Sequence, residues 1–182
     1  MKHVIILLLG MGIFSCTPKE DSSSEQLVPD KDNGGLTLPE GFSSLVVTEE
    51  TGRGRHLAIN QNGDIYVSLR DESENRGIAC IRDTTGDGKA DIIEYAGEHT
   101  GTGIKIHNGY LYFGADTAVV RYPLNDGELV PGKEWELIAR GFPTERQHEA
   151  KPMTFDNKGN MFVTVGAPAN ACMEQMRTKG SP

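Results

Sequence analysis

A repeated segment constrains the fold of this chain more than any other feature of its sequence. Each copy has an apolar strand, a polar turn that ends in glycine, and an alternating strand with an aromatic residue (Tyr66, Tyr112 or Phe162). The copies span residues 56–69, 103–115 and 152–167. Their turn glycines, Gly63, Gly109 and Gly159, lie 46 and 50 residues apart. This spacing is typical of four-stranded β-propeller blades, so we predict an all-β propeller.

The intervals between the copies supply the remaining strands of each blade. They read GIACIRD and DIIEYAG after the first copy, then TAVVRYPL and WELIARG after the second. FSSLVVTEE, residues 42–50, is predicted as an outer strand that completes another blade. A single blade cannot bury both faces, and a ring needs at least about four blades. The chain holds about two and a half, so we expect a truncated ring that is aggregation-prone and inactive by itself.

The N-terminus has the pattern of an export signal. Lys2 and His3 precede an apolar run at residues 4–14, which is too short to cross roughly 30 Å of hydrocarbon. The run ends in the aliphatic Ile13, followed by Phe14, Ser15 and Cys16, and this order is similar to a bacterial lipobox. We therefore predict a lipoprotein signal peptide over residues 1–16, lipidation of Cys16, and a lipid anchor facing the periplasm or cell surface. An ordinary signal peptide before a chance cysteine is the alternative.

Composition divides the rest of the chain. Residues 17–35 are polar and lack aromatic side chains, which predicts a flexible tether before a partial propeller at residues 36–182. The formal charge of −8 disfavours nucleic acid as a partner. Cys80 is predicted to be buried, and its pairing with Cys172 in an oxidising compartment stays open. Nucleotide-loop, zinc-protease and serine-hydrolase motifs do not occur in the sequence.

His148 is the candidate catalytic residue, because it lies in a predicted loop just ahead of a blade's innermost strand. Such loops open at the rim of a propeller's central channel. An imidazole there can accept a proton from a substrate hydroxyl near neutral pH. Arg53 and Arg55 occupy the equivalent place in the first blade, where guanidinium groups suit carboxylates. His99 and His107 lie in predicted turns, where a histidine is most often exposed to solvent and has no catalytic role.

A second candidate site is the segment DTTGDGKADIIE, residues 83–94. Its spacing follows that of a calcium loop, with Thr85 in place of an acidic or amide residue. The candidate ligands are Asp83, Thr85, Asp87, the carbonyl of Lys89, Asp91 and Glu94. An acidic connection between two strands explains the segment equally well. A metal here would be structural, because the turn lies far from the channel.

Several segments in one order resemble the N-terminal part of the sorbosone dehydrogenase-like family. These proteins are bacterial relatives of the pyrroloquinoline quinone (PQQ)-dependent soluble sugar and pyranose dehydrogenases. The resemblance covers residues 36–182 and is carried by LPEGFSSLVV, GRGRHLAINQNGDIYVSLR, RDTTGDGKADIIE, GTGIKIHNGYLYFGADTAVVRYPL and RQHEAKPMTFDNKGNMFVTVGAPANACME.

This resemblance implies a six-bladed propeller that binds PQQ with calcium on its axis. It implies that His148 is the general base, which takes a proton from a sugar hydroxyl or hydrated aldehyde while hydride passes to the quinone. Arg55 matches a family position near the cofactor. Most other cofactor contacts and the calcium ligands belong to later blades, and the electron acceptor is unknown. The alternatives are a non-catalytic binding or scaffold propeller and a calcium-dependent lactonase-like propeller, which the few inner-strand carboxylates disfavour.

Overall fold

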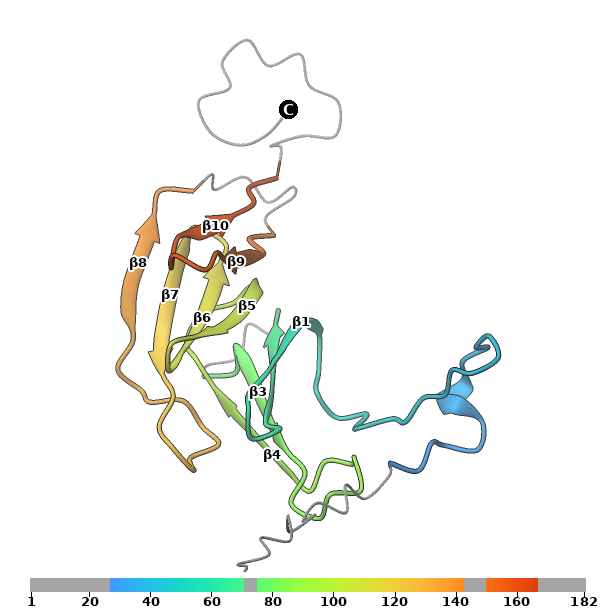
Figure 1. Cartoon of the computed structure of the whole chain (residues 1–182). Helices are drawn as coiled ribbons and strands as arrows, with labels where there is room; N and C mark the ends of the chain where they lie inside the picture. Colours follow the sequence, from blue (N-terminus) through green and yellow to red (C-terminus); the bar gives the residue numbers. More distant parts are fainter. Residues whose placement is uncertain (1–26, 71–74, 143–149, 167–182) are drawn as a thin grey trace, which may run out of the picture.

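The computed structural model describes residues 27–70, 75–142 and 150–166, which form two antiparallel sheets, a hairpin and one 3-10 turn (Figure 1). The 3-10 turn is η1 (Asn33–Gly35). The first sheet has the strand order β1 (Gly54–Ile59), β2 (Ile65–Leu69), β3 (Ile78–Arg82), β4 (Ile92–Ala96). The second has the order β5 (Gly101–His107), β6 (Tyr110–Ala115), β7 (Ala118–Pro123), β8 (Glu136–Arg140). The hairpin pairs β9 (Met153–Phe155) with β10 (Met161–Val163).

The three predicted repeats are confirmed as the hairpins that start each sheet. They are β1–β2, β5–β6 and β9–β10, each antiparallel. The turn glycines Gly63, Gly109 and Gly159 have φ angles of 93°, 75° and 83°. Side chains with a Cβ rarely adopt this left-handed conformation, which explains why glycine recurs at the same place in each repeat.

The sheets are arranged as blades of a propeller, which confirms the predicted fold class. In Figure 1 the first strands β1, β5 and β9 lie toward a common side, and β4 and β8 lie on the outside. β5 packs against β1 on one side and against β9 on the other. Each sheet also runs in sequence order from its innermost to its outermost strand.

The core lies between the two complete blades. Its members come from both sheets and are apolar or aromatic: Ala58, Tyr66, Ile78, Cys80, Ala96, Ile104, Leu111, Phe113, Ala115, Val120, Tyr122 and Leu129. The hydroxyl group of the buried Tyr66 donates a hydrogen bond of 3.0 Å to the carbonyl of Leu129 in the second blade. Neither blade could bury these side chains without the other.

The segment ahead of β1 differs from its prediction. Residues 42–50 form no strand, because a strand requires a partner ladder and this segment makes only isolated backbone bonds, such as Ala90 N–H to the carbonyl of Val47 at 2.9 Å. Residues 30–35, from the stretch predicted as a tether, are joined to the body by hydrogen bonds. The carboxylate of Asp30 accepts the N–H of Val46 at 2.8 Å.

Within the described ranges of the chain, no helix has the length and apolar character required to cross a membrane.

Candidate functional site

The innermost strands of both complete blades carry an irregularity near their first residues. In β1, Gly54 pairs with Leu69 but Leu57 pairs with Val67, so the pairing shifts across Arg55 and His56. In β5 the pairing shifts across Thr102. Such β-bulges redirect side chains out of the regular alternation. The bulges therefore place Arg55, His56 and Thr102 at the same end of neighbouring inner strands.

A hydrogen-bond network joins these bulges across the blades. The ring nitrogen Nδ1 of His56 and the hydroxyl of Ser68 both bond the carbonyl oxygen of Thr102, the latter at 2.9 Å. The hydroxyl oxygen of Ser68 also accepts the N–H of His56 at 3.1 Å. The hydroxyl of Thr102 in turn accepts the N–H of Lys151 at 3.1 Å, just ahead of β9. The network thus connects the starts of all three inner strands.

The partner of His56 decides how its imidazole can act. A carbonyl oxygen only accepts, so Nδ1 must carry the hydrogen in this contact. The other nitrogen, Nε2, then holds a lone pair when the ring is neutral. The exposed His56 ring is therefore held in the tautomer that can accept a proton at Nε2.

Lys151 is the most deeply buried cation among the described residues of this site, with 1% of its surface exposed. Burial lowers the pKa of its ammonium group, and the charge of Asp116 opposes that shift. Its backbone lies close against β5 and β6, since a Cβ built at Gly103 or Gly114 would fall 2.0 or 2.4 Å from the Lys151 carbonyl oxygen. Only glycine leaves room for this approach.

Of the catalytic and cofactor-binding residues predicted from the sequence, the structure places only Arg55 at this site. Arg55 lies on the β1 bulge and is exposed, as is Arg53, whose carbonyl accepts the N–H of Arg70 at 3.1 Å. His148 and the lipidation candidate Cys16 lie outside the described residues, so their assignments stay predictions. Sequence reasoning missed Ser68, Thr102 and Lys151. The position of Lys151 directly before Pro152, in the loop that enters the third repeat, was the available signal.

The calcium-loop candidate, residues 83–94, forms the connection from β3 to β4. One carboxylate oxygen of Asp83 accepts the N–H groups of Thr85 and Gly86 at 3.0 and 2.7 Å, and the other accepts Gly88 N–H at 2.7 Å. These N–H groups hold the pKa of Asp83 below its usual value, the bond from Gly88 contributing most. The loop is thus closed by backbone donors around a central carboxylate.

The other candidate ligands have partners or positions of their own. The carboxylate of Asp91 accepts the backbone and hydroxyl groups of Thr84, both at 2.7 Å. Asp87 accepts the N–H of Lys89 at 2.8 Å, and Glu94 lies on β4 opposite Cys80. In residues 27–70, 75–142 and 150–166, no group of three or more His, Cys, Asp or Glu side chains is placed to hold a metal ion. The assignment of calcium to this loop stays a prediction.

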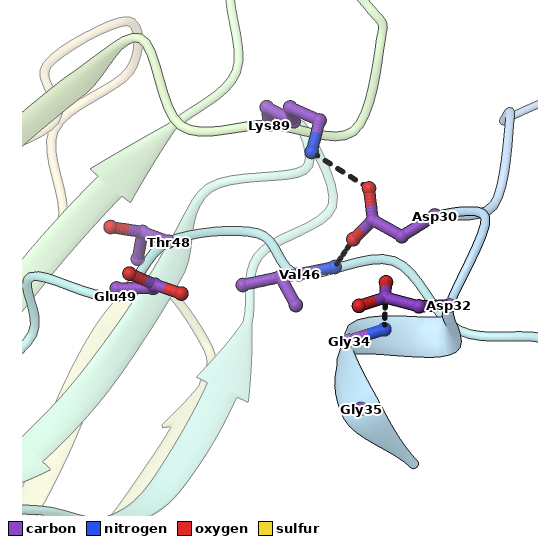
Figure 2. Close-up of a pocket in the computed structure, with 8 residues that line it drawn as sticks. All are labelled: Asp30, Asp32, Gly34, Gly35, Val46, Thr48, Glu49 and Lys89. Carbon is purple, nitrogen blue, oxygen red and sulfur yellow. Dashed lines mark hydrogen bonds and ion pairs between the residues drawn. The ribbon is translucent and has the colours of Figure 1, made fainter. Parts of the chain in front are cut away.

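A shallow groove of about 520 Å³ lies between the segment around η1 and residues 46–49, and Lys89 of the β3–β4 loop also lines it (Figure 2). The ammonium group of Lys89 lies 3.1 Å from one oxygen of Asp30, whose other oxygen accepts the N–H of Val46. The Val46 bond first, and then Lys89, lowers the pKa of Asp30. These contacts fasten the N-terminal segment to the β3–β4 loop.

Cys80 lies in the core between the blades and is fully buried and free of any disulfide. Burial raises the pKa of its thiol to about 12. A thiol that stays protonated is a poor nucleophile, so Cys80 has no catalytic role in this site. Cys172, its candidate partner, lies outside the described residues.

The fold and the inner-strand site define the chain as part of a β-propeller. Several solved structures are similar to it in fold. The PQQ domain of pyranose dehydrogenase from Coprinopsis cinerea, in its holo form, is similar with a TM-score of 0.58 and 12% identity, over 68% of this chain and 30% of that one. A Trichoderma reesei protein of Carbohydrate-Active Enzymes Family AA12, in an iodide structure, is similar with a TM-score of 0.56 and 15% identity, over 69% and 33%.

The same Trichoderma reesei protein in a calcium structure is similar with a TM-score of 0.55 and 15% identity. No protein-family model matches the sequence, and no curated protein matches it either. The chain spans about a third of the length of these solved structures. At these identities the likeness establishes the propeller fold.

Proposed function

We propose that this chain contributes the first blades of a PQQ-dependent dehydrogenase that oxidises a sugar or a sugar aldehyde. The observation that carries the proposal is the meeting of the three inner strands, where hydrogen bonds join His56, Thr102 and the backbone of Lys151, and Arg55 lies on the adjoining β1 bulge. The similarity in fold to a holo PQQ domain of a pyranose dehydrogenase supports it.

The residues at this end of the strands fit the chemistry of PQQ, which carries several carboxylates. Arg53 and Arg55 are exposed where β1 begins, and the buried Lys151 lies just ahead of β9. Guanidinium forks bind planar carboxylates in pairs. When bound, PQQ supplies the hydride acceptor of the reaction. Arg55 would hold one carboxylate, and the network through Thr102 would keep the strands in register around the cofactor.

Proton transfer in this proposal belongs to His148, four residues ahead of Pro152 in the sequence. Its imidazole would take the proton from the sugar hydroxyl or hydrated aldehyde as hydride leaves the same carbon. His56 would orient the hydroxyl through Nε2, because its Nδ1 is committed to Thr102. Calcium on the propeller axis, which the family resemblance implies, would be held mainly by later blades of the ring.

We further propose that residues 1–16 direct export and that Cys16 is lipidated, which would tether the propeller to a membrane facing the periplasm or cell surface. Labelled fatty acid should enter the wild-type chain and not the Cys16→Ser variant. Label in the variant would exclude this anchor.

The test of the enzymatic proposal uses the protein that carries the complete ring, reconstituted with PQQ. His148→Ala should bind PQQ with unchanged affinity and oxidise aldoses 10²–10⁴-fold more slowly, as is typical for loss of a general base. Arg55→Ala should weaken PQQ binding instead. Lys133→Ala, on the outer β7–β8 loop, is the matched control and should change neither.

Two results would contradict the proposal. If the complete protein does not bind PQQ in the micromolar range, the ring is a binding or scaffold propeller. If it binds PQQ but His148→Ala turns over at the wild-type rate, the base lies elsewhere, with His56 as the next residue to replace.

A further inference from the structure

The opposite end of the inner strands carries two grooves that the proposed active site does not use. The active-site network lies where β1 and β5 begin, whereas these grooves lie at the turns where the strands end. A groove of about 640 Å³ runs between the β1–β2 turn, the β5–β6 turn and the β7–β8 loop. A second, of about 480 Å³, runs between the β5–β6 and β9–β10 turns. His107 and Asn108 line both, so the grooves flank a single turn.

The lining of the grooves is rich in carboxamides, which donate and accept hydrogen bonds equally well. They are Asn60, Gln61, Asn62, Asn108, Asn125 and Asn157. The charged lining residues are balanced. The two acidic residues, Asp126 and Asp156, are equal in number to the two basic residues, Lys105 and Lys158. This balance contrasts with the formal charge of −8 on the whole chain. A ligand suited to this surface would be neutral and rich in hydroxyl groups.

An aromatic pair forms the ridge between the two grooves. The imidazole of His107 stacks on the ring of Phe155, with centroids 4.1 Å apart and an interplanar angle of 3°. Tyr112 contacts Phe155 edge-on at 4.8 Å. No described residue forms a hydrogen bond with either ring nitrogen of His107. The ridge therefore offers an apolar ring surface next to two unused polar atoms.

The walls of the first groove are fixed before any ligand arrives. Leu124 N–H donates to the carbonyl of Gly109 at 2.9 Å, which joins the β7–β8 loop to the β5–β6 turn. Arg82 bonds the carboxylate of Asp64 in the β1–β2 turn and the carbonyl of Gly127 in the β7–β8 loop. A groove with fixed walls loses little conformational entropy on binding.

We propose that the two grooves together form a binding site for a neutral oligosaccharide, centred on the β5–β6 turn and separate from the site at the other end of the strands. Sugar hydroxyls both donate and accept, which matches the His107 nitrogens and the carboxamides that form no hydrogen bond with a described residue: Gln61, Asn108 and Asn157. Asn60, Asn62 and Asn125 already form side-chain hydrogen bonds within their own loops and offer only their remaining donors and acceptors. The absence of net charge in the lining disfavours anionic polymers. Two grooves on either side of one turn suit a chain of several sugar units rather than a monosaccharide.

Titration calorimetry and amide chemical-shift mapping of the protein that carries the complete ring, purified without PQQ, test this site. Maltohexaose and cellohexaose are the neutral probes, and hexagalacturonate is the anionic probe. At least one neutral probe should bind saturably and shift amides in residues 59–62, 106–109, 124–127 and 154–159. The anionic probe should bind at least tenfold more weakly. Because no cofactor is present, failure of the dehydrogenase proposal would not alter this result.

Variants then locate the site. His107→Ala should weaken binding at least tenfold, and His107→Phe, which keeps the stack on Phe155, should also weaken binding because it removes the nitrogens. Asn125→Ala, an exposed change, provides a second variant if His107→Ala does not fold. Lys133→Ala should bind as wild type does. The absence of saturable binding, a preference for hexagalacturonate, or full affinity in both His107→Phe and Asn125→Ala would overturn the proposal.

Discussion

Arg82 donates two hydrogen bonds to the buried carboxylate of Asp64, one from Nε to Oδ1 and one from Nη2 to Oδ2, both of 2.7 Å. Asp64 lies in the β1–β2 turn and is 1% exposed, and Arg82 ends β3. A third donor, Nη1, reaches the carbonyl of Gly127 in the second blade at 3.3 Å. One arginine thus connects the first turn of one blade to the outer loop of the next.

Loss of this pair should destabilise the folded chain. Asp64→Ala removes a buried acceptor and leaves Arg82 without its partner, so we expect the free energy of unfolding to fall by about 2–4 kcal/mol in urea denaturation. Glu136→Gln, which disrupts the exposed pair with Arg121, is the control and should have a much smaller effect. Equal losses in the two variants would contradict the importance assigned to burial.

The same pair gives a pH dependence of known sign. Arg82 first, and Asn62 after it, holds the pKa of Asp64 below its usual value. The stabilisation is therefore complete above the unfolded pKa of about 3.9 and is lost as the pH falls through the lower folded pKa. Acid titration of stability should show this loss in the wild type and not in Asp64→Ala.

His99 should report its protonation through the single tryptophan of the chain. Its ring meets Trp135 edge-on, with centroids 4.7 Å apart, and its Nδ1 lies 2.8 Å from the hydroxyl of Tyr122. Burial lowers the pKa of His99, and the charge of Glu98 opposes this. Since a protonated imidazole quenches indole fluorescence, emission should fall as the pH drops, with a midpoint below about 6.5.

The lowered pKa of His99 also determines whether the folded chain gains or loses stability as the pH changes. A depressed histidine pKa gives stability that is full above about pH 6.5 and is lost as the pH falls through the folded value. His99→Phe keeps the aromatic contact and should abolish the fluorescence transition. A transition of unchanged midpoint and size in this variant would assign it to another group.

Gly103→Ala should separate the third hairpin from the second blade. The added Cβ would fall 2.0 Å from the carbonyl oxygen of Lys151, where backbone has to move. We expect a loss of about 1–3 kcal/mol and faster amide exchange in β9 and β10, with β2 and β3 unchanged. Thr154→Ala, an exposed change on β9, is the control. Uniform exchange across all strands would instead indicate global destabilisation.

Asp83→Ala should open the β3–β4 loop. Three backbone N–H groups lose their acceptor, so limited proteolysis at residues 84–90 should be faster than in the wild type. A loop held by hydrogen bonds alone is cut at the same rate with calcium and with chelator. Protection of the wild type by calcium, absent in Asp83→Ala, would support metal binding after all.

The blade pattern was readable from the sequence because it depends on local rules. Gly63, Gly109 and Gly159 each adopt a left-handed backbone, and in the first two repeats the aromatic residue three positions later, Tyr66 or Tyr112, packs toward the next blade. The site was less accessible. Thr102 lies in a turn-rich stretch, and its role arises from a bulge and from contacts with residues 46 and 49 positions away in the sequence. No local pattern encodes such distant contacts.

The segment at residues 42–50 illustrates the same limit. Its short apolar run, Leu45 to Val47, is rich in valine as strands are, but a strand exists only where another chain segment offers a ladder. The spacing of residues 83–94 likewise does not reveal that the carboxylate of Asp83 accepts backbone N–H groups of its own loop. Both patterns specify which residues are available and leave their partners open.

The hydroxyl of Tyr66 bonds the carbonyl of Leu129 inside the core between the blades. A phenol in the first blade therefore depends on the second blade for its only hydrogen-bonding acceptor among the described residues. If the second blade opened alone, this hydroxyl and the apolar face around it would lose their partners together. The free energies of the two blades are thus coupled, and we expect them to open together rather than one at a time.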